Sequence, residues 1–242
     1  MRRLKNTVSI LAAAAFFLWL SGCNPPAAGE PPATPSPTAS LLEATDIVSP
    51  LAARDYLTFD DSSWKREFLP EFVVVHFTSA VVLNKQTPCD IQSIRPIFET
   101  SEIGINYVVD RSGAAVCWLP EERAAWHAGS GTWNNDPKYT NTLNKYSIGI
   151  ELFAIGSQND MAQYLHPWEY EALDSALIGY TEEQYATLSA LIADICSRWH
   201  IPCDRRHILG HEEYSPGKTD PGELFDWDKL MSLTKQKLEN PT

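Results

Sequence analysis

The segment Phe72-Val73-Val74-Val75-His76-Phe77 is a continuous apolar run rich in valine, interrupted by one histidine. Such a run is typical of a β-strand that is buried on both faces, which is the position of a central strand in a sheet. The histidine stands near the end of the run, where a strand would deliver its side chain to the edge of the sheet. The segment therefore predicts a central sheet with His76 at its edge.

Shorter strands are expected on the C-terminal side of this segment. They cover residues 105–109, 114–119 and 147–153, and the first two flank Asp110-Arg111-Ser112-Gly113, a turn signal. Pro88-Cys89-Asp90 offers an N-terminal signal for a helix that extends to about residue 101. Residues 41–66 mix apolar side chains with Asp, Ser and Thr, and are expected to form short helix or loop that packs onto the domain.

Two amphipathic helices are expected in the C-terminal third. The helix over residues 180–200 has Thr181 as its cap with Gln184 three residues later, and Pro202 follows its end. Its apolar stripe consists of Tyr185, Leu188, Leu191, Ile192, Ile195 and Trp199. A second helix over 226–239 has Asp226 as N-cap, and its apolar positions are Trp227, Leu230, Leu233 and Leu238. The elements together predict an α/β domain with a mixed central β-sheet flanked by helices.

Length and charge restrict the class of protein. The chain has 242 residues, and roughly 200 remain for folding once an export segment and a linker are removed, enough for one domain. We expect that domain over residues 41–242, with a core of about 68–225. Hydrophobic residues make up 44% of the chain, which is typical of a globular enzyme. The net charge of −12 argues against a nucleic-acid partner, because phosphate binding needs clustered Lys and Arg. We expect a monomer.

The N-terminus has the features of an export signal. Arg2, Arg3 and Lys5 precede an apolar segment over 8–20 that is too short to span a bilayer as a stable helix. Leu20-Ser21-Gly22-Cys23 then resembles the bacterial lipobox, in which the cysteine is lipidated. We predict a lipoprotein signal peptide over 1–22 and a tether over 23–40 that starts at the lipidated Cys23 and is rich in proline. An ordinary cleaved signal peptide with an incidental cysteine is the alternative, and the sequence leaves open which membrane holds the anchor.

A loop near the C-terminus has the chemistry of half a metal site. The sequence Gly210-His211-Glu212-Glu213-Tyr214-Ser215-Pro216-Gly217-Lys218-Thr219-Asp220-Pro221-Gly222 places an imidazole, an ammonium and a carboxylate on a loop stiffened by prolines. His211 and Asp220 would be two zinc ligands, and a catalytic zinc needs a third protein ligand together with an open position. The best candidate for the third ligand is His76.

Six local sequences appear in succession and carry a family resemblance. They are Val74-Val75-His76-Phe77-Thr78, Asn106-Tyr107-Val108-Val109-Asp110-Arg111-Ser112-Gly113, Ala125-Trp126-His127-Ala128-Gly129, Ser147-Ile148-Gly149-Ile150-Glu151-Leu152, Tyr180-Thr181-Glu182-Glu183-Gln184-Tyr185 and the loop from 209 to 222. Together they resemble the zinc-dependent N-acetylmuramoyl-L-alanine amidases of the type 2 amidase family, whose fold peptidoglycan recognition proteins share. The resemblance covers residues 72–222, most of the mature chain.

The resemblance implies hydrolysis of the amide between N-acetylmuramic acid and L-alanine. His76, His211 and Asp220 would bind Zn²⁺, Glu151 would be the general base, and Lys218 would stabilise the oxyanion of the tetrahedral intermediate. Glu151 closes an otherwise apolar strand, an unfavourable place for a charge unless a function requires it. The alternatives are a hydrogen-bonded core histidine, a glutamate turned to solvent and a solvated loop lysine.

Other positions are less strongly marked. In relatives the segment with Trp126 and His127 lines the substrate cleft, so the resemblance makes both substrate-binding residues; a surface loop is the alternative. Asn106 stands where the family often has histidine. The loop between His211 and Asp220 is one residue shorter than in many relatives.

Four cysteines follow Cys23 in what we expect to be an exported chain, where disulfides can form. Cys196 and Cys203 flank the end of the long helix and are the favoured bridge, which would leave Cys89 and Cys117 as a second pair. Three pairings are formally open.

Two other functions fit the same motifs. One is a recognition module that binds peptidoglycan without cutting it, and the other is a zinc peptidase that acts on the stem peptide. The sequence also leaves open whether the substrate is intact wall or soluble anhydro-muropeptide. The insertion over 156–179, with Tyr164, Trp168 and Tyr170, is a candidate for that choice. An exported, anchored enzyme of this kind would face the cell wall.

Overall fold

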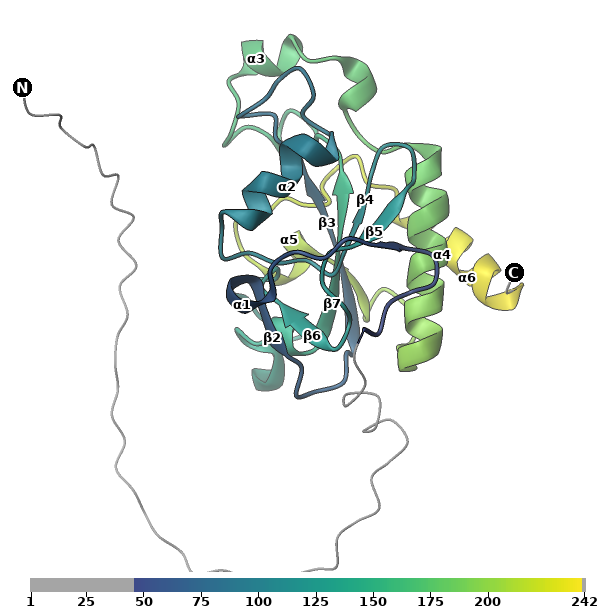
Figure 1. The fold of residues 1–242 in the computed structure, drawn as a ribbon. Coiled ribbons are helices and arrows are strands. Elements are labelled where there is room, and N and C mark those ends of the chain that lie inside the picture. Colours follow the sequence, from purple (N-terminus) through teal and green to yellow (C-terminus); the bar gives the residue numbers. More distant parts are fainter. Residues whose placement is uncertain (1–45, 241–242) are drawn as a thin grey trace, which may run out of the picture. The chain divides into compact units, whose positions relative to one another are not determined.

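A six-stranded sheet forms the centre of the domain in the computed structural model, which describes residues 46–240 (Figure 1). In spatial order its strands are β1 (Ala53–Arg54), β5 (Ala115–Cys117), β4 (Tyr107–Val109), β7 (Ser147–Phe153), β3 (Phe72–Thr78) and β8 (Ile208–Gly210). Every neighbouring pair is parallel except β4 and β5. The predicted mixed sheet is confirmed, with the valine-rich strand β3 between two parallel neighbours.

The segment before β3 is more ordered than its composition indicated. Its described part forms β1, the short helix α1 (Phe59–Ser62) and β2 (Ser63–Lys65), and β2 pairs antiparallel with β6 (Arg123–Ala125). Arg66 follows β2 with its side chain fully buried, and its guanidinium donates to the backbone carbonyls of Glu121, Arg123, Lys145 and Ser147. This segment thus joins the sheet through partners far along the chain, which local composition does not show.

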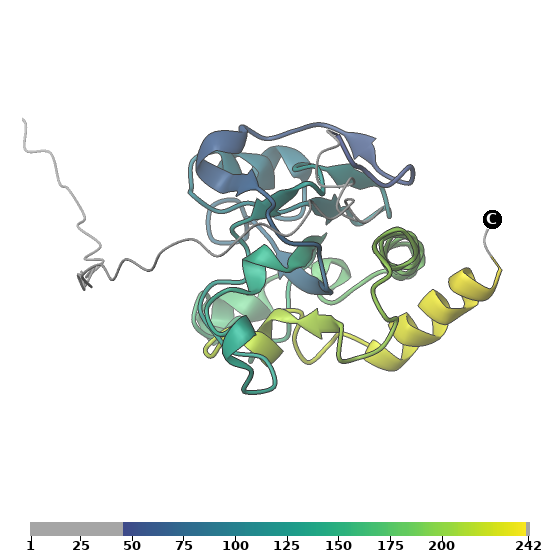
Figure 2. The same cartoon turned by 90° about the horizontal axis from the view of Figure 1, so that it is seen from below.

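One face of the sheet is covered by α4 (Glu182–Trp199), as predicted. Thr181 and Gln184 form the capping box, and all six residues of the predicted stripe are buried. Figures 1 and 2 show α6 (Trp227–Glu239) beside α4, with Asp226 accepting the first-turn hydrogen bond from the Lys229 amide. The prediction was wrong for Leu238, which is exposed because the last turn of α6 extends beyond the core.

The opposite face packs against α2 (Ile91–Glu99), whose Ile94 and Phe98 are buried there. The other short helices are α3 (Pro167–Glu171), α5 (His211–Tyr214) and three 3-10 helices, Pro137–Tyr139, Leu143–Lys145 and Ser175–Leu177. Alternation along β3 and β7 sends Val73, Val75, Ile148, Ile150 and Leu152 toward α4. The residues that alternate with them along the two strands, including His76, Gly149 and Glu151, therefore face the side that α4 does not cover.

The disulfide prediction was wrong: all four cysteines in the described part of the chain are free thiols. Cys89 and Cys117 cannot pair because they lie in separate hydrophobic clusters on opposite faces of the sheet. Cys196 is buried on the core-facing side of α4 as a small apolar side chain, whereas Cys203 packs at the margin of the same cluster.

The predicted signal peptide over 1–22, the lipidated Cys23 and the tether over 23–40 lie outside the described residues. Between residues 46 and 240, none of the helices has the length and apolar character needed to cross a membrane.

Candidate active site and metal centre

Strand register brings the predicted site residues together. In the parallel pairing of β3 with β7, His76 stands opposite Glu151. In the pairing of β3 with β8, Val75 stands opposite Gly210, so His211 follows at the level of His76. The carboxyl ends of neighbouring parallel strands form one edge, where ligands commonly bind in open α/β sheets. Three polar residues from distant parts of the sequence therefore meet at one place.

The three predicted metal ligands form a tight cluster. His76 Nδ1 lies 3.1 Å from His211 Nδ1 and 2.8 Å from Asp220 Oδ2, and His211 Nδ1 lies 3.0 Å from the same oxygen. Their ligand atoms all lie within 4.8 Å of one another. Two imidazole nitrogens and a carboxylate are a donor set that suits Zn²⁺.

The protonation states of the three side chains favour binding of a cation between them. His211 Nε2 lies 3.1 Å from the carbonyl oxygen of Ala128, which can only accept, so Nε2 carries the proton and Nδ1 of the neutral ring has a free lone pair. Burial, assisted by neighbouring His211, lowers the pKa of His76 to about 4, although Asp220 acts in the opposite direction. Burial alone would raise the pKa of Asp220, but the adjoining imidazoles of His211 and His76 hold it below its usual range. Neutral imidazoles and an ionised carboxylate are the protonation states that metal binding requires.

Glu151 lies beside this cluster with an oxygen that has no partner. Its Oε2 is buried and makes no hydrogen bond to any residue that the structure describes. Burial and the charge of Asp220 raise the pKa of Glu151 well above its ordinary value, while Lys218 opposes the shift. A buried carboxylate without a partner is costly, so this arrangement is expected where the group takes part in chemistry.

Lys218 completes the charged groups of the site. Its exposed side chain borders the same pocket as His76 and Glu151, a cavity of about 260 Å³. Within residues 46–240 the Lys218 ammonium forms no salt bridge. Lys85, Lys138 and Lys229, in contrast, each pair with a glutamate. The ammonium is therefore available to a ligand in the pocket.

The predicted substrate-binding pair divides into two different environments. Trp126 is 48% exposed at the pocket and packs against Trp64, with ring centroids 4.2 Å apart. His127 also borders the pocket, but both of its ring nitrogens are engaged within the protein, by His76 and by Ser147. Ser147 begins β7 and one of the six motifs, but the sequence predicted no role for it.

Asn106 has a structural position rather than a place in the pocket. Its side chain is fully buried, donates to the carbonyls of Leu119, Pro120 and Arg123, and accepts from the Gly149 amide. The residue thus connects β7 to the chain around β6.

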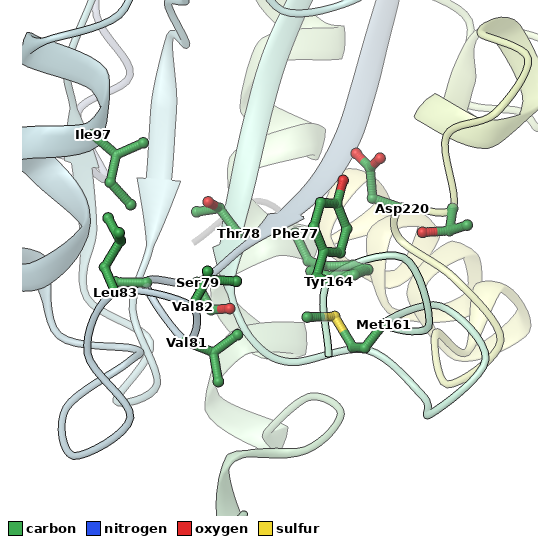
Figure 3. A pocket seen from close by; sticks show the side chains of 12 residues that line it. Phe77, Thr78, Ser79, Val81, Val82, Leu83, Ile97, Met161, Tyr164 and Asp220 are labelled. Atoms are coloured by element: carbon green, nitrogen blue, oxygen red, sulfur yellow. The ribbon is translucent and has the colours of Figure 1, made fainter. Parts of the chain in front are cut away.

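An apolar pocket of about 300 Å³ adjoins the candidate metal ligands at Asp220 (Figure 3). Figure 3 shows Leu83 and Ile97 on one side and Met161 and Tyr164 on the other, with Asp220 at one end. Of the three aromatic residues in the 156–179 insertion, Tyr164 borders both pockets, whereas Trp168 lies beneath the Lys85 ammonium and Tyr170 packs into the core. The insertion therefore reaches the site through Tyr164.

Curated relatives are similar to this chain in sequence over part of their length. The chain is 29% identical over 132 residues to 1,6-anhydro-N-acetylmuramyl-L-alanine amidase AmpD of Citrobacter freundii, covering 54% of this chain and 57% of the relative. It is 29% identical over 167 residues to N-acetylmuramoyl-L-alanine amidase AmiD of Escherichia coli K12, covering 65% of this chain and 51% of the relative. The chain thus spans little more than half the length of these relatives.

Solved structures agree on the fold. A selenomethionine derivative of AmpD superposes with a TM-score of 0.54 at 22% identity, over 77% of this chain and 96% of that one. AmiD of E. coli, in complex with the substrate anhydro-N-acetylmuramic acid-L-Ala-D-γ-Glu-L-Lys, superposes with a TM-score of 0.50 at 26% identity, over 68% of this chain and 57% of that one. A sequence profile of the N-acetylmuramoyl-L-alanine amidases matches residues 65–223, well over half of the chain, and the chain belongs to that family.

Proposed function

We propose that this protein is a zinc-dependent amidase that hydrolyses the bond between the lactyl group of N-acetylmuramic acid and L-alanine, in peptidoglycan or in muropeptides. The observation that carries the proposal is the cluster of His76, His211 and Asp220 beside the unpartnered carboxylate oxygen of Glu151. Membership of the amidase family supports it, as does the substrate that AmiD holds in its solved structure.

The donor set fits zinc, and His76, His211 and Asp220 would hold the ion. Zinc in this position would polarise the scissile carbonyl and lower the pKa of water to about 7. The protein contributes a buried, preformed set of ligands and a pocket that opens on one side of them.

Glu151 and Lys218 supply the remaining chemistry. Glu151 takes a proton from the water that attacks the carbonyl carbon, and its raised pKa suits transfer of that proton to the departing amine nitrogen. The Lys218 ammonium offsets the negative charge that develops on the carbonyl oxygen. The new C–O bond leaves the lactyl group as a carboxylate, and cleavage of the C–N bond frees the amino group of L-alanine.

Trp126 is assigned to substrate binding. Its half-exposed indole offers an aromatic face at the pocket, fixed in place by packing on Trp64. The apolar pocket beside Asp220 and Tyr164 has room for a further part of the substrate next to the scissile bond.

A test of the activity compares purified protein with its Glu151→Ala variant on muropeptides in the presence of zinc. We expect the wild type to release peptides that begin with L-alanine, and mass spectrometry of the products separates this cleavage from cuts within the stem peptide. Binding to cell walls without new N-terminal alanine would favour a recognition module instead. If the wild type and Glu151→Ala released the same products in the same amounts, the proposed enzyme activity would be refuted.

We also propose that the protein is exported and lipid-anchored through Cys23, facing the cell wall, and that it acts as a monomer. The support for export and for the anchor is the sequence of residues 1–40. Cells expressing the protein should incorporate labelled fatty acid into it, and Cys23→Ser should abolish the label. Persistence of the label in that variant would contradict the anchor. Light scattering of protein that lacks the lipid measures its molar mass in solution, and a mass of two or more chains would contradict the monomer.

A further inference from the structure

The outward nitrogen of the ligand His76 meets another histidine. His76 Nε2 lies 2.9 Å from His127 Nδ1, and His127 Nε2 lies 3.0 Å from Ser147 Oγ. Ser147 Oγ in turn donates to the carbonyl oxygen of Leu143 at 2.8 Å. Metal-binding histidines more often donate to a carboxylate, a carbonyl or water, so an imidazole in this position calls for an explanation.

The direction of every proton in this chain follows from its last member. The Leu143 carbonyl can only accept, so the Ser147 hydroxyl points toward it and Ser147 Oγ is left to accept from His127 Nε2–H. A neutral His127 ring then has a free lone pair on Nδ1, which accepts from His76 Nε2–H. His76 is thereby held as the tautomer whose Nδ1 lone pair faces His211 and Asp220.

The neighbouring residue does the same for the second histidine ligand. The Ala128 carbonyl accepts from His211 Nε2, as described above, so residues 127 and 128 orient both imidazoles. Their own backbone is fixed by Asn144, whose Oδ1 accepts from the amides of His127 at 3.1 Å and Ala128 at 2.7 Å. Two hydrogen bonds from one side chain therefore hold the backbone of residues 127 and 128 in place.

Strand β7 leaves space for the His127 ring. A Cβ added at Gly149 would lie 2.8 Å from His127 Cγ and 2.9 Å from its Nδ1, closer than real contacts of this kind. The His127 ring can therefore occupy its place against β7 only because residue 149 has no side chain. This explains a glycine in the middle of a buried strand, where it otherwise weakens the sheet.

We propose that His127 is a positioning residue: through Ser147 it holds His76 in the tautomer and orientation that bind zinc. The proposal rests on the zinc site proposed above and replaces direct substrate contact as the main role of His127. Loss of a comparable partner costs 10–100-fold in metal affinity in other metalloproteins.

The test measures zinc affinity of metal-free protein by competition with a chromogenic chelator. His127→Ala should bind zinc about 10–100-fold more weakly, whereas His127→Asn, whose amide oxygen can stand near the position of Nδ1, should recover most of the loss. His200→Asn, a change at a left-handed position remote from the site, is the matched control and should bind like the wild type. Unchanged affinity in His127→Ala, or equal weakening in the Ala and Asn variants, overturns the proposal.

A second measurement separates this proposal from the zinc site itself. In zinc-loaded protein labelled with ¹⁵N-histidine, nuclear magnetic resonance should show a His76 Nε2–H proton that is protected from solvent exchange in the wild type and exchanges rapidly in His127→Ala. If the wild type bound no zinc, the proposed function would fail. If it bound zinc but the His76 Nε2–H proton exchanged equally fast in both proteins, only the role of His127 would be overturned.

Discussion

Replacing Glu151 by glutamine should make the zinc-free protein more stable and, with zinc present, nearly inactive. The side chain has a buried oxygen without a partner in the described domain, and its pKa is raised by burial and by Asp220. An unsatisfied buried polar group costs about 1–3 kcal/mol, and more when it is charged. Because glutamine removes the charge but keeps the shape, we expect a gain of about 1–2 kcal/mol at pH 8. For a domain of this size, that gain raises Tm by roughly 2–4 °C per kcal/mol.

The gain should depend on pH in one direction. A carboxyl whose pKa is raised in the folded state binds more protons there than in the unfolded chain, so its contribution to the free energy of unfolding falls as pH rises. Below about pH 4 the carboxyl is protonated in both states, and wild type and Glu151→Gln should have similar Tm values. The difference should open as pH increases and level off above the folded pKa.

Thermal unfolding of both proteins with a chelator, from acid to alkaline pH, is the assay. Glu67→Gln, at an exposed glutamate, is the matched control and should change Tm little. In the presence of zinc, kcat of Glu151→Gln should fall about 10²–10⁴-fold while zinc stoichiometry is retained. A variant less stable than the wild type at pH 8, or a gain of equal size at every pH, would refute the reasoning.

Four further variants test other parts of the site and fold. Asp220→Ala should reduce bound zinc from about one per chain to near zero, measured by metal analysis, because it removes a ligand; retained stoichiometry would contradict the ligand set. Lys218→Ala should lower kcat about 10²–10³-fold with zinc still bound, as removal of an oxyanion partner does elsewhere, and unchanged steady-state kinetics would remove its role. Gly149→Ala should weaken zinc binding in the chelator competition by displacing the His127 ring; wild-type affinity would show that the ring can move freely. Thr181→Ala should lower the free energy of unfolding by about 1 kcal/mol in urea titration, through loss of the α4 cap, without altering kcat, and a loss of activity would link α4 to the site.

Local sequence was sufficient for the elements that carry their own signals. A few neighbouring residues define the valine run of β3 and the capping box of α4. The same holds for the motifs around His76, Glu151 and His211. Periodicity shows which face a residue presents, and motif order shows which residues belong to one site. The sequence therefore predicts the candidate metal ligands and the proposed general base.

The roles of His127, Asn106 and the cysteines were decided by tertiary structure. The partners of His127 lie 20 and 51 residues away along the chain, and they meet it only because β3 and β7 pair in one register with a glycine beneath the ring. Cys89 and Cys117 are separated because they lie on opposite faces of the sheet. A sequence determines which residues can bind a metal, since that is a property of each side chain; which residue orients which ligand depends on contacts between distant segments, and only the folded chain defines those contacts.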